Sequence, residues 1–182
     1  MHRLTLLTAA LAATLISSSA AQATIRLAND PGGLIAAYEA RFARARATHE
    51  RIVIDGSCLS ACTLAIGMVP REQICATPRA VLGFHAAWQP TPFGKAISAP
   101  ATQQMMSIYP PEIRAWIGRH GGLRPNLIYL RSPELAEFLP ACTDNEIQEA
   151  HNVTHRVHHH LRSTLAFRSP RYRVFAVRPY SY

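Results

Sequence analysis

The sequence predicts one α/β domain. Short apolar segments typical of strands alternate with segments of helical periodicity, and this order favours helices layered on sheets with parallel strands. The chain has 182 residues and 48% of them are hydrophobic, which is sufficient for a single compact domain with a real core. No internal repeat of fixed period is present. Together these observations predict an α/β fold in a single domain.

The first half of the domain is expected to form a strand, a turn, a helix and a second strand. Residues 24–28 and 51–55 are short apolar runs, which indicates strands. Residues 29–33 (NDPGG) combine Pro with paired Gly and predict a turn. Residues 34–48 place apolar side chains at a period near 3.6, which predicts a helix, and residues 63–69 are expected to form a short buried helix.

The second half is expected to continue this alternation. A strand is predicted from Ile74 to His85, and the Pro- and Gly-rich residues 89–100 are expected to form a loop. Two helices follow and are separated at Pro110-Pro111. The second helix is expected to begin at Pro111, because proline is tolerated in a first helical turn. A short apolar run at 127–130 precedes a helix from Ser132 to Leu139, in which Ser132 is the expected N-cap.

The two ends of the chain differ in composition from the domain between them. A short basic start precedes an Ala- and Leu-rich apolar run, and small residues then lead to Ala-Gln-Ala at 21–23, a pattern typical of a cleaved secretory signal. The apolar run is shorter than the roughly 20 residues of a membrane-spanning helix. The sequence therefore predicts a signal peptide at 1–23, an exported domain at 24–149 that is periplasmic or secreted, and a tail at 150–182.

The formal net charge of +8 is concentrated in the tail. No acidic residue follows Glu149, and the tail is basic and aromatic with a cluster of histidines. A solvated basic tail is the favoured interpretation, so a nucleic-acid partner is not expected. The alternatives are nucleic-acid binding through the tail and metal binding through its histidines. The basic residues are Arg156, Arg162, Arg168, Arg171, Arg173 and Arg178, and the histidines are His155, His158, His159 and His160.

Four cysteines lie in the exported region, at Cys58, Cys62, Cys75 and Cys142. An even number in an exported chain favours two disulfide bonds, since exported proteins meet an oxidising environment. Three pairings are possible, and the sequence does not choose among them. A metal site built from the same cysteines is the alternative, but their spacing does not match a standard zinc ribbon, so no metal is expected.

A serine and a histidine in the middle of the domain have the arrangement expected of a nucleophile and its base. Ser60 lies in a turn of small residues that leads into the apolar helix, and His85 lies at the end of a predicted strand. A nucleophilic serine needs a base that takes its proton, and amide donors for the oxyanion that forms. The amide of Ala61 is a natural first donor, because it lies at a helix N-terminus. The turn at Gly32-Gly33 is expected to supply a second, because glycine permits close backbone approach.

The same turn offers other nucleophiles. Ser57 is an alternative to Ser60, although it lies farther from the apolar helix. Cys58 or Cys62 could act with His85, but a disulfide is the favoured state of both thiols in an oxidising compartment. Ser60 is therefore the expected nucleophile.

Four short motifs in this order resemble the Clp-type serine peptidases of the Clp/crotonase superfamily, over residues 24–139. Asp30-Pro31-Gly32-Gly33 is similar to the family's S-P-G-G turn, and Ser60-Ala61 is similar to its nucleophile and the residue that follows. His85 follows Ser60 by 25 positions (85 − 60), the interval expected between the family's serine and histidine. The segment from Tyr129 to Glu137 is similar to the family's F-L-x-A-P-E-A-x-E segment.

The resemblance implies stacked ββα units of the Clp/crotonase type and a serine hydrolase that acts on peptide bonds without a cofactor. In these terms Ser60 is the nucleophile, His85 is the general base, and the amides of Gly33 and Ala61 form the oxyanion hole. The family's triad aspartate has no counterpart here, and Asn126 is the nearest polar residue that could orient His85. This departure leaves a second interpretation, a catalytically silent relative that acts as a binding or assembly module.

The expected partner is a peptide or protein substrate. The resemblance also implies a homo-oligomer, since subunits of this family assemble into rings. An exported protein meets no ATP, so no ATP-driven unfoldase is expected to act with it.

Overall fold

The structure is a computed structural model that describes residues 23–154. Three parallel strands form its first sheet. The middle strand is fully buried at its three apolar residues, as expected of a parallel sheet that is covered on both faces. The strands expected at 24–28 and 51–55 are therefore confirmed. In their order across the sheet the strands are β1 (Thr24–Leu27), β2 (Arg51–Ile54) and β4 (Ile74–Ala76).

The second sheet is antiparallel on one side and parallel on the other. Its strands, in order, are β3 (Ser57–Leu59), β5 (Val81–Phe84) and β8 (Ile128–Arg131), with β3 parallel and β8 antiparallel to β5. The chain crosses from β2 to β3 at Gly56, whose φ of +145° is rarely adopted by L side chains. The prediction of a single strand from Ile74 to His85 is wrong. Pro78 interrupts this segment, and its two parts, β4 and β5, belong to different sheets.

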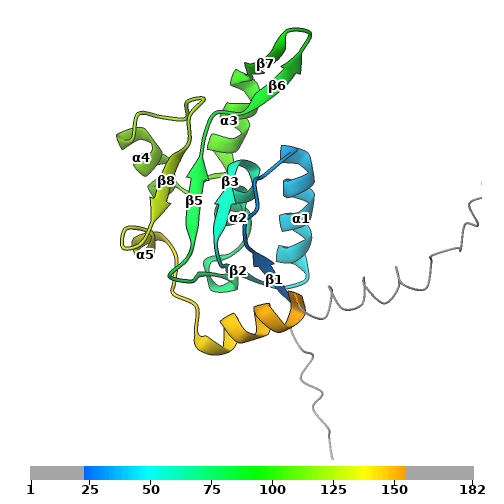
Figure 1. Ribbon diagram of the computed structural model, residues 1–182, viewed down its shortest axis with the longest axis vertical. Coiled ribbons are helices and arrows are strands. Elements are labelled where there is room, and N and C mark those ends of the chain that lie inside the picture. The colour runs from blue at the N-terminus through cyan, green and yellow to red at the C-terminus, as the bar shows by residue number, and fades with distance from the viewer. Residues whose placement is uncertain (1–22, 155–182) are drawn as a thin grey trace, which may run out of the picture.

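Helices cover the sheets and close a common core (Figure 1). Phe84 of β5 lies edge-on to Tyr109, with 5.4 Å between ring centroids, and 5.6 Å from the ring of Trp116; all three side chains are buried. The helices are α1 (Ile35–Ala47), the 3-10 helix η1 (Ser60–Leu64), α2 (Ala65–Met68), the 3-10 helix η2 (Arg71–Gln73), α3 (Ala99–Ile108), α4 (Pro111–Arg119) and α5 (Leu135–Phe138).

Most of the helix predictions are confirmed. The helix expected at 34–48 is α1, the apolar segment at 63–69 lies in η1 and α2, and a break at Pro110 separates α3 from α4. The start of α5 differs from the prediction, because residues 132–134 form a turn and no side chain caps the helix. Ser132 is therefore not its N-cap.

Residues 89–100 were expected to form a loop, but most of them form an antiparallel hairpin. Its strands are β6 (Trp88–Thr91) and β7 (Gly94–Ile97), and Figure 1 shows the hairpin projecting from one end of the molecule. Gly94, at φ +121°, follows the turn that joins the two strands. The prediction failed because Pro and Gly also occur in the tight turns that join hairpin strands, so they do not by themselves indicate a longer loop.

A helix that begins at residue 144 and continues to residue 154 lies at the opposite end (Figure 1). Cys142, just before this helix, is joined by a disulfide to Cys75 of β4, and Ala150 within it is buried. The domain boundary expected between 149 and 150 therefore falls inside a helix. The predicted signal peptide and the histidine-containing tail lie outside the described residues, apart from Ala23 and residues 150–154.

The described residues form a single mixed α/β domain with small sheets, which confirms the coarse fold class. Of the three cysteine pairings left open by the sequence, the structure has Cys58–Cys62 and Cys75–Cys142. Two intramolecular disulfides indicate an oxidising, exported environment. Between residues 23 and 154, no helix combines the length and the apolar character needed to cross a membrane.

Candidate active site

The glycine turn that precedes α1 lies directly against the start of η1. Asp30 forms a bridge to β3, in which its amide donates to the Ser57 carbonyl at 2.8 Å and its carbonyl accepts from the Leu59 amide at 2.9 Å. At Gly32, φ is +80°, and a Cβ would lie 2.5 Å from the Leu59 oxygen and 2.7 Å from the Cβ of Ser60. Only glycine fits such an approach, so the sequence here brings a bare backbone against Ser60.

The carboxylate of Asp30 holds this turn in shape. It accepts hydrogen bonds from the Gly32 amide at 2.9 Å and from the Tyr38 hydroxyl, and it forms an ion pair with Arg41 at 3.3 Å. Burial, together with the hydrogen bond to Asp30, raises the pKa of Tyr38 to about 12, so its hydroxyl remains a donor. The sequence analysis missed this role, although an aspartate two residues before a glycine is a known turn signal.

Ser60 has a backbone conformation that is unusual for a residue with a side chain. Its φ is +56°, and such a conformation costs about 1–3 kcal/mol unless the surrounding structure imposes it. The Thr63 hydroxyl donates to the Ser60 carbonyl at 2.6 Å, and the Tyr109 hydroxyl donates in turn to Thr63 at 2.6 Å. Burial raises the pKa of Tyr109, which keeps that donor protonated. Backbone strain of this kind is concentrated at functional sites.

A disulfide also fixes the Ser60 turn. Cys58 and Cys62 lie two residues on either side of Ser60, and their Cα atoms are 5.3 Å apart. Both cysteines are fully buried. Neither sulfur is a free thiol, so Cys58 and Cys62 are not nucleophiles in this structure.

His85 follows β5 and has a defined tautomer. Its Nδ1 lies 2.7 Å from the carbonyl oxygen of Ala86. A carbonyl oxygen only accepts hydrogen bonds, so Nδ1 carries the hydrogen and Nε2 is left as the acceptor. This is the tautomer that a general base for serine requires.

The orienting partner of His85 differs from the expected one. Asn126 is exposed in the segment before β8 and makes no hydrogen bond to His85. The carbonyl of Ala86 accepts from Nδ1, as the triad carboxylate does in serine proteases. A backbone carbonyl is not readable from a sequence motif, and this explains why sequence reasoning did not find it.

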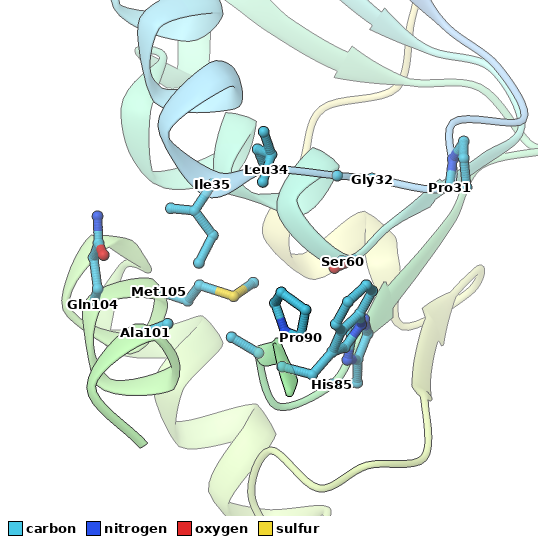
Figure 2. Close-up of a pocket in the computed structure, with 13 residues that line it drawn as sticks. Pro31, Gly32, Leu34, Ile35, Ser60, His85, Pro90, Ala101, Gln104 and Met105 are labelled. Atoms are coloured by element: carbon cyan, nitrogen blue, oxygen red, sulfur yellow. The ribbon is translucent and has the colours of Figure 1, made fainter. Parts of the chain in front are cut away.

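Ser60 and His85 line the same pocket, which has a volume of about 520 Å³. Figure 2 shows both residues on one side of the pocket, with Ile35 and Met105 on the other. Ser57, the alternative nucleophile, does not line this pocket, and its hydroxyl lies 3.5 Å from the Asn29 side-chain oxygen. The other lining residues are mainly apolar: Pro31, Gly32, Gly33, Leu34, Ala87, Trp88, Pro90, Ala101 and Gln104.

Of the two residues expected to supply oxyanion amides, Gly33 lines the pocket, whereas Ala61 is fully buried and does not line it. The Ala61 amide belongs to the first turn of η1, whose amides have no partner within the helix. A Cβ on Gly32 would lie 3.0 Å from that amide nitrogen, so the glycine turn reaches it closely. The Gly33 amide makes no hydrogen bond within residues 23–154, and Gly33 lines the pocket.

The arrangement combines a hydroxyl, an imidazole and backbone amides at an apolar pocket. Among the described residues no hydrogen bond joins the Ser60 hydroxyl to His85, and such bonds are often formed only when substrate is bound. The side chains that line the pocket are apolar or neutral apart from the imidazole, so the pocket lining has no carboxylate that would bind a cation. The chemistry that these groups permit is attack by an activated oxygen on a carbonyl carbon.

Comparison with known proteins identified no relative of this chain. No protein-family model matches the chain, and no curated protein is significantly similar to it. The proposed function therefore depends on the groups around Ser60 alone.

Proposed function

We propose that this chain is an exported serine hydrolase that cleaves peptide bonds, with Ser60 as nucleophile and His85 as general base. The observation that carries the proposal is the strained Ser60, at φ +56°, on a pocket that it shares with His85. Asn29 and His49 also have a positive φ, but of these three residues Ser60 is the one that lines the pocket with His85.

The reaction proceeds through two acyl-transfer steps. Nε2 of His85 takes the proton of the Ser60 hydroxyl while Oγ attacks the scissile carbonyl, and the amides of Gly33 and Ala61 stabilise the oxyanion. His85 then gives the proton to the leaving amine, and the C–N bond breaks. In the second step His85 removes a proton from water, which attacks the acyl-enzyme and releases Ser60.

The proposal includes a Clp/crotonase-like arrangement and a location in the periplasm or outside the cell. Two small sheets that are mainly parallel, with the glycine turn packed on the Ser60 turn, support this relationship. The two disulfides support export. The proposed partner is an unfolded peptide or protein, without an ATP-driven unfoldase, and the proposed assembly is a homo-oligomer.

A catalytically silent binding module is the second candidate. The observation in its favour is the partner of His85, since the Ala86 carbonyl carries no charge to stabilise an imidazolium. Replacing the aspartate of a serine-protease triad lowers kcat about 10⁴-fold. A slow hydrolase and a silent module therefore differ mainly in rate.

The test is hydrolysis of a dye-labelled unfolded casein by the purified protein and three variants. We expect Ser60→Ala and His85→Ala each to abolish release of labelled peptides, while Ser57→Ala, in the same turn, retains it. Circular dichroism and thermal unfolding of each variant control for folding. Hydrolysis that survives in folded Ser60→Ala, or that is absent from the folded parent protein, would contradict the proposal.

A further inference from the structure

The hairpin of β6 and β7 is an apolar arm that contacts little else. Phe93 at its tip is 100% exposed, Trp88 is 47% exposed and Ile97 is 46% exposed. These are three of the five large hydrophobic side chains that are exposed among the described residues. Apolar side chains gathered on one exposed element mark an interaction surface.

One face of the hairpin is continuous with the pocket. Trp88 lies opposite Ile97, and Pro90 lies opposite Lys95, so these four residues share a face. Trp88 and Pro90 also line the pocket that contains Ser60. Whatever covers this face therefore lies at the mouth of the candidate active site.

Two residues disfavour another polypeptide strand as the occupant. Pro90 in β6 has no amide hydrogen to offer to a neighbouring strand. Lys95 in β7 places a charge on a short edge strand, which also discourages edge-to-edge pairing. The hairpin therefore favours a partner that receives side chains over one that pairs with its backbone.

The hairpin itself carries a single charge, the ammonium of Lys95. Between residues 80 and 111 the chain has no acidic residue, and its one lysine or arginine there is Lys95. The Lys95 ammonium lies 3.7 Å from the centroid of the Trp88 ring. Lys95 forms no ion pair with a carboxylate within residues 23–154. Exposed aromatics beside an unpaired cation complement an anionic lipid surface.

We propose that the β6–β7 hairpin docks this protein on an anionic membrane surface. Phe93 inserts at the boundary between headgroups and acyl chains, Trp88 lies at headgroup depth, and Lys95 faces the lipid phosphates. Docking turns the pocket toward the bilayer. This binding does not depend on hydrolysis, so it stands or falls independently of the proposed function.

Trp88 makes the hairpin observable without a label. The chain has two tryptophans, and the other, Trp116, is fully buried. The experiment adds vesicles of equal parts phosphatidylcholine and phosphatidylglycerol to the purified protein, and measures flotation and tryptophan emission. We expect the protein to float with the vesicles and its emission to shift to shorter wavelength. Vesicles of phosphatidylcholine alone should bind less, because they lack the anionic lipid.

Variants of the hairpin distinguish vesicle binding through the hairpin from vesicle binding through the basic tail, because the tail is present in every protein compared. We expect Phe93→Ser to weaken vesicle binding about tenfold and to remove the emission shift, since it deletes the inserted side chain. Lys95→Glu should weaken binding in the same direction. The matched control is Tyr129→Ser on β8, an exposed aromatic beside Arg131, and it should bind as the parent protein does.

Three results would overturn the proposal. The first is vesicle binding by folded Phe93→Ser that equals that of the parent protein. The second is flotation without any change in Trp88 emission, which would assign binding to the tail. The third is an emission shift with unfolded casein but not with vesicles, which would make the hairpin a contact for polypeptide substrate.

Discussion

The two disulfides of this protein tie down regions that are built by different means. Cys58–Cys62 spans 4 positions around Ser60, where the turn is fixed by the hydroxyls of Thr63 and Tyr109, a glycine backbone and the single carboxylate of Asp30. Cys75–Cys142 spans 67 positions and fastens the helix at 144–154 to the first sheet. The first region contains the strained residue, and the second contains a network of charges.

The charged region is centred on the buried carboxylate of Asp55. It accepts hydrogen bonds from Arg79 at 2.7 Å, from Arg26 at 2.7 Å, from Thr77 at 2.9 Å, and His151 lies 3.0 Å away. Burial on its own would raise the pKa of Asp55, but these hydrogen bonds outweigh it and hold the pKa well below its usual range. We therefore expect stability to depend most on the region around Asp55 and the proposed chemistry to depend on the region around Ser60.

The largest expected effect on function comes from Gly32→Ala. The new Cβ would lie 2.5 Å from the Leu59 carbonyl oxygen and displace the turn from Ser60. We expect hydrolysis to fall by about 10²-fold or more, because misplacing catalytic groups by about 1 Å has effects of this size. The rate of peptide release from the labelled casein measures this loss of activity.

Gly94→Ala is the matched control for this change. Gly94 also has a positive φ, of +121°, but nothing lies within 4 Å of a Cβ built there. Backbone strain alone should therefore lower the stability of both variants. Equal losses of activity in Gly32→Ala and Gly94→Ala would contradict the idea that the glycine turn shapes the site.

Removal of each disulfide should separate stability from activity. By the loop-entropy relation, loss of the long Cys75–Cys142 loop costs about 4 kcal/mol and loss of the short Cys58–Cys62 loop costs about 2 kcal/mol. Paired Cys→Ala variants, compared by urea unfolding and by peptide release, give both quantities. We expect the Cys75/Cys142 variant to unfold more easily, and the Cys58/Cys62 variant to lose more activity per folded molecule. The reverse order would contradict the division between the two regions.

Asp55→Asn should destabilise the fold by about 2–4 kcal/mol, because it leaves Arg26 and Arg79 without their carboxylate. The folded-state pKa of Asp55 is depressed. The stabilisation is therefore present above the unfolded-state pKa of about 3.9 and is lost as pH falls below it.

Unfolding by urea across acidic pH measures this contribution. Asp55→Asn should show a flatter loss of stability below about pH 4 than the parent protein. Parallel curves for the two proteins would show that Asp55 does not contribute in this way.

Tyr38→Phe should have the smallest effect. The mutation removes one hydrogen bond to the Asp30 carboxylate, and hydrogen bonds to charged groups contribute about 1.5–3 kcal/mol. The folded-state pKa of Tyr38 is raised to about 12 from 10.0, so its stabilisation is complete below pH 10.0 and is lost as pH rises toward 12. The phenylalanine variant should lose this alkaline dependence, and an unchanged alkaline limb would contradict the role given to Tyr38.

The sequence predicted features that depend on local pattern. Apolar runs at β1 and β2, the periodicity of α1 and the break at Pro110 are readable in short windows, because each depends on residues close together in the chain. Ser60 and His85 could be named because a serine before an apolar helix and a histidine after a strand are also local patterns. The structure brings both to one pocket.

Features that depend on distant contacts could not be predicted. Thr63 and Tyr109 are 46 positions apart, and their bond depends on how η1 packs against the end of α3. The disulfide pairing required knowing that Cys142 lies beside β4. The partner of His85 is a backbone carbonyl that every residue possesses, so no residue type could signal it.

The proposed function depends on Ser60 being an activated nucleophile with His85 as its base. Reaction with a fluorophosphonate probe, followed by mass spectrometry of the peptide that carries the adduct, tests this. We expect one adduct, on Ser60, that is lost in Ser60→Ala and in His85→Ala and is kept in Ser57→Ala. An unlabelled protein that is folded and disulfide-intact, or an adduct on another residue, would contradict it.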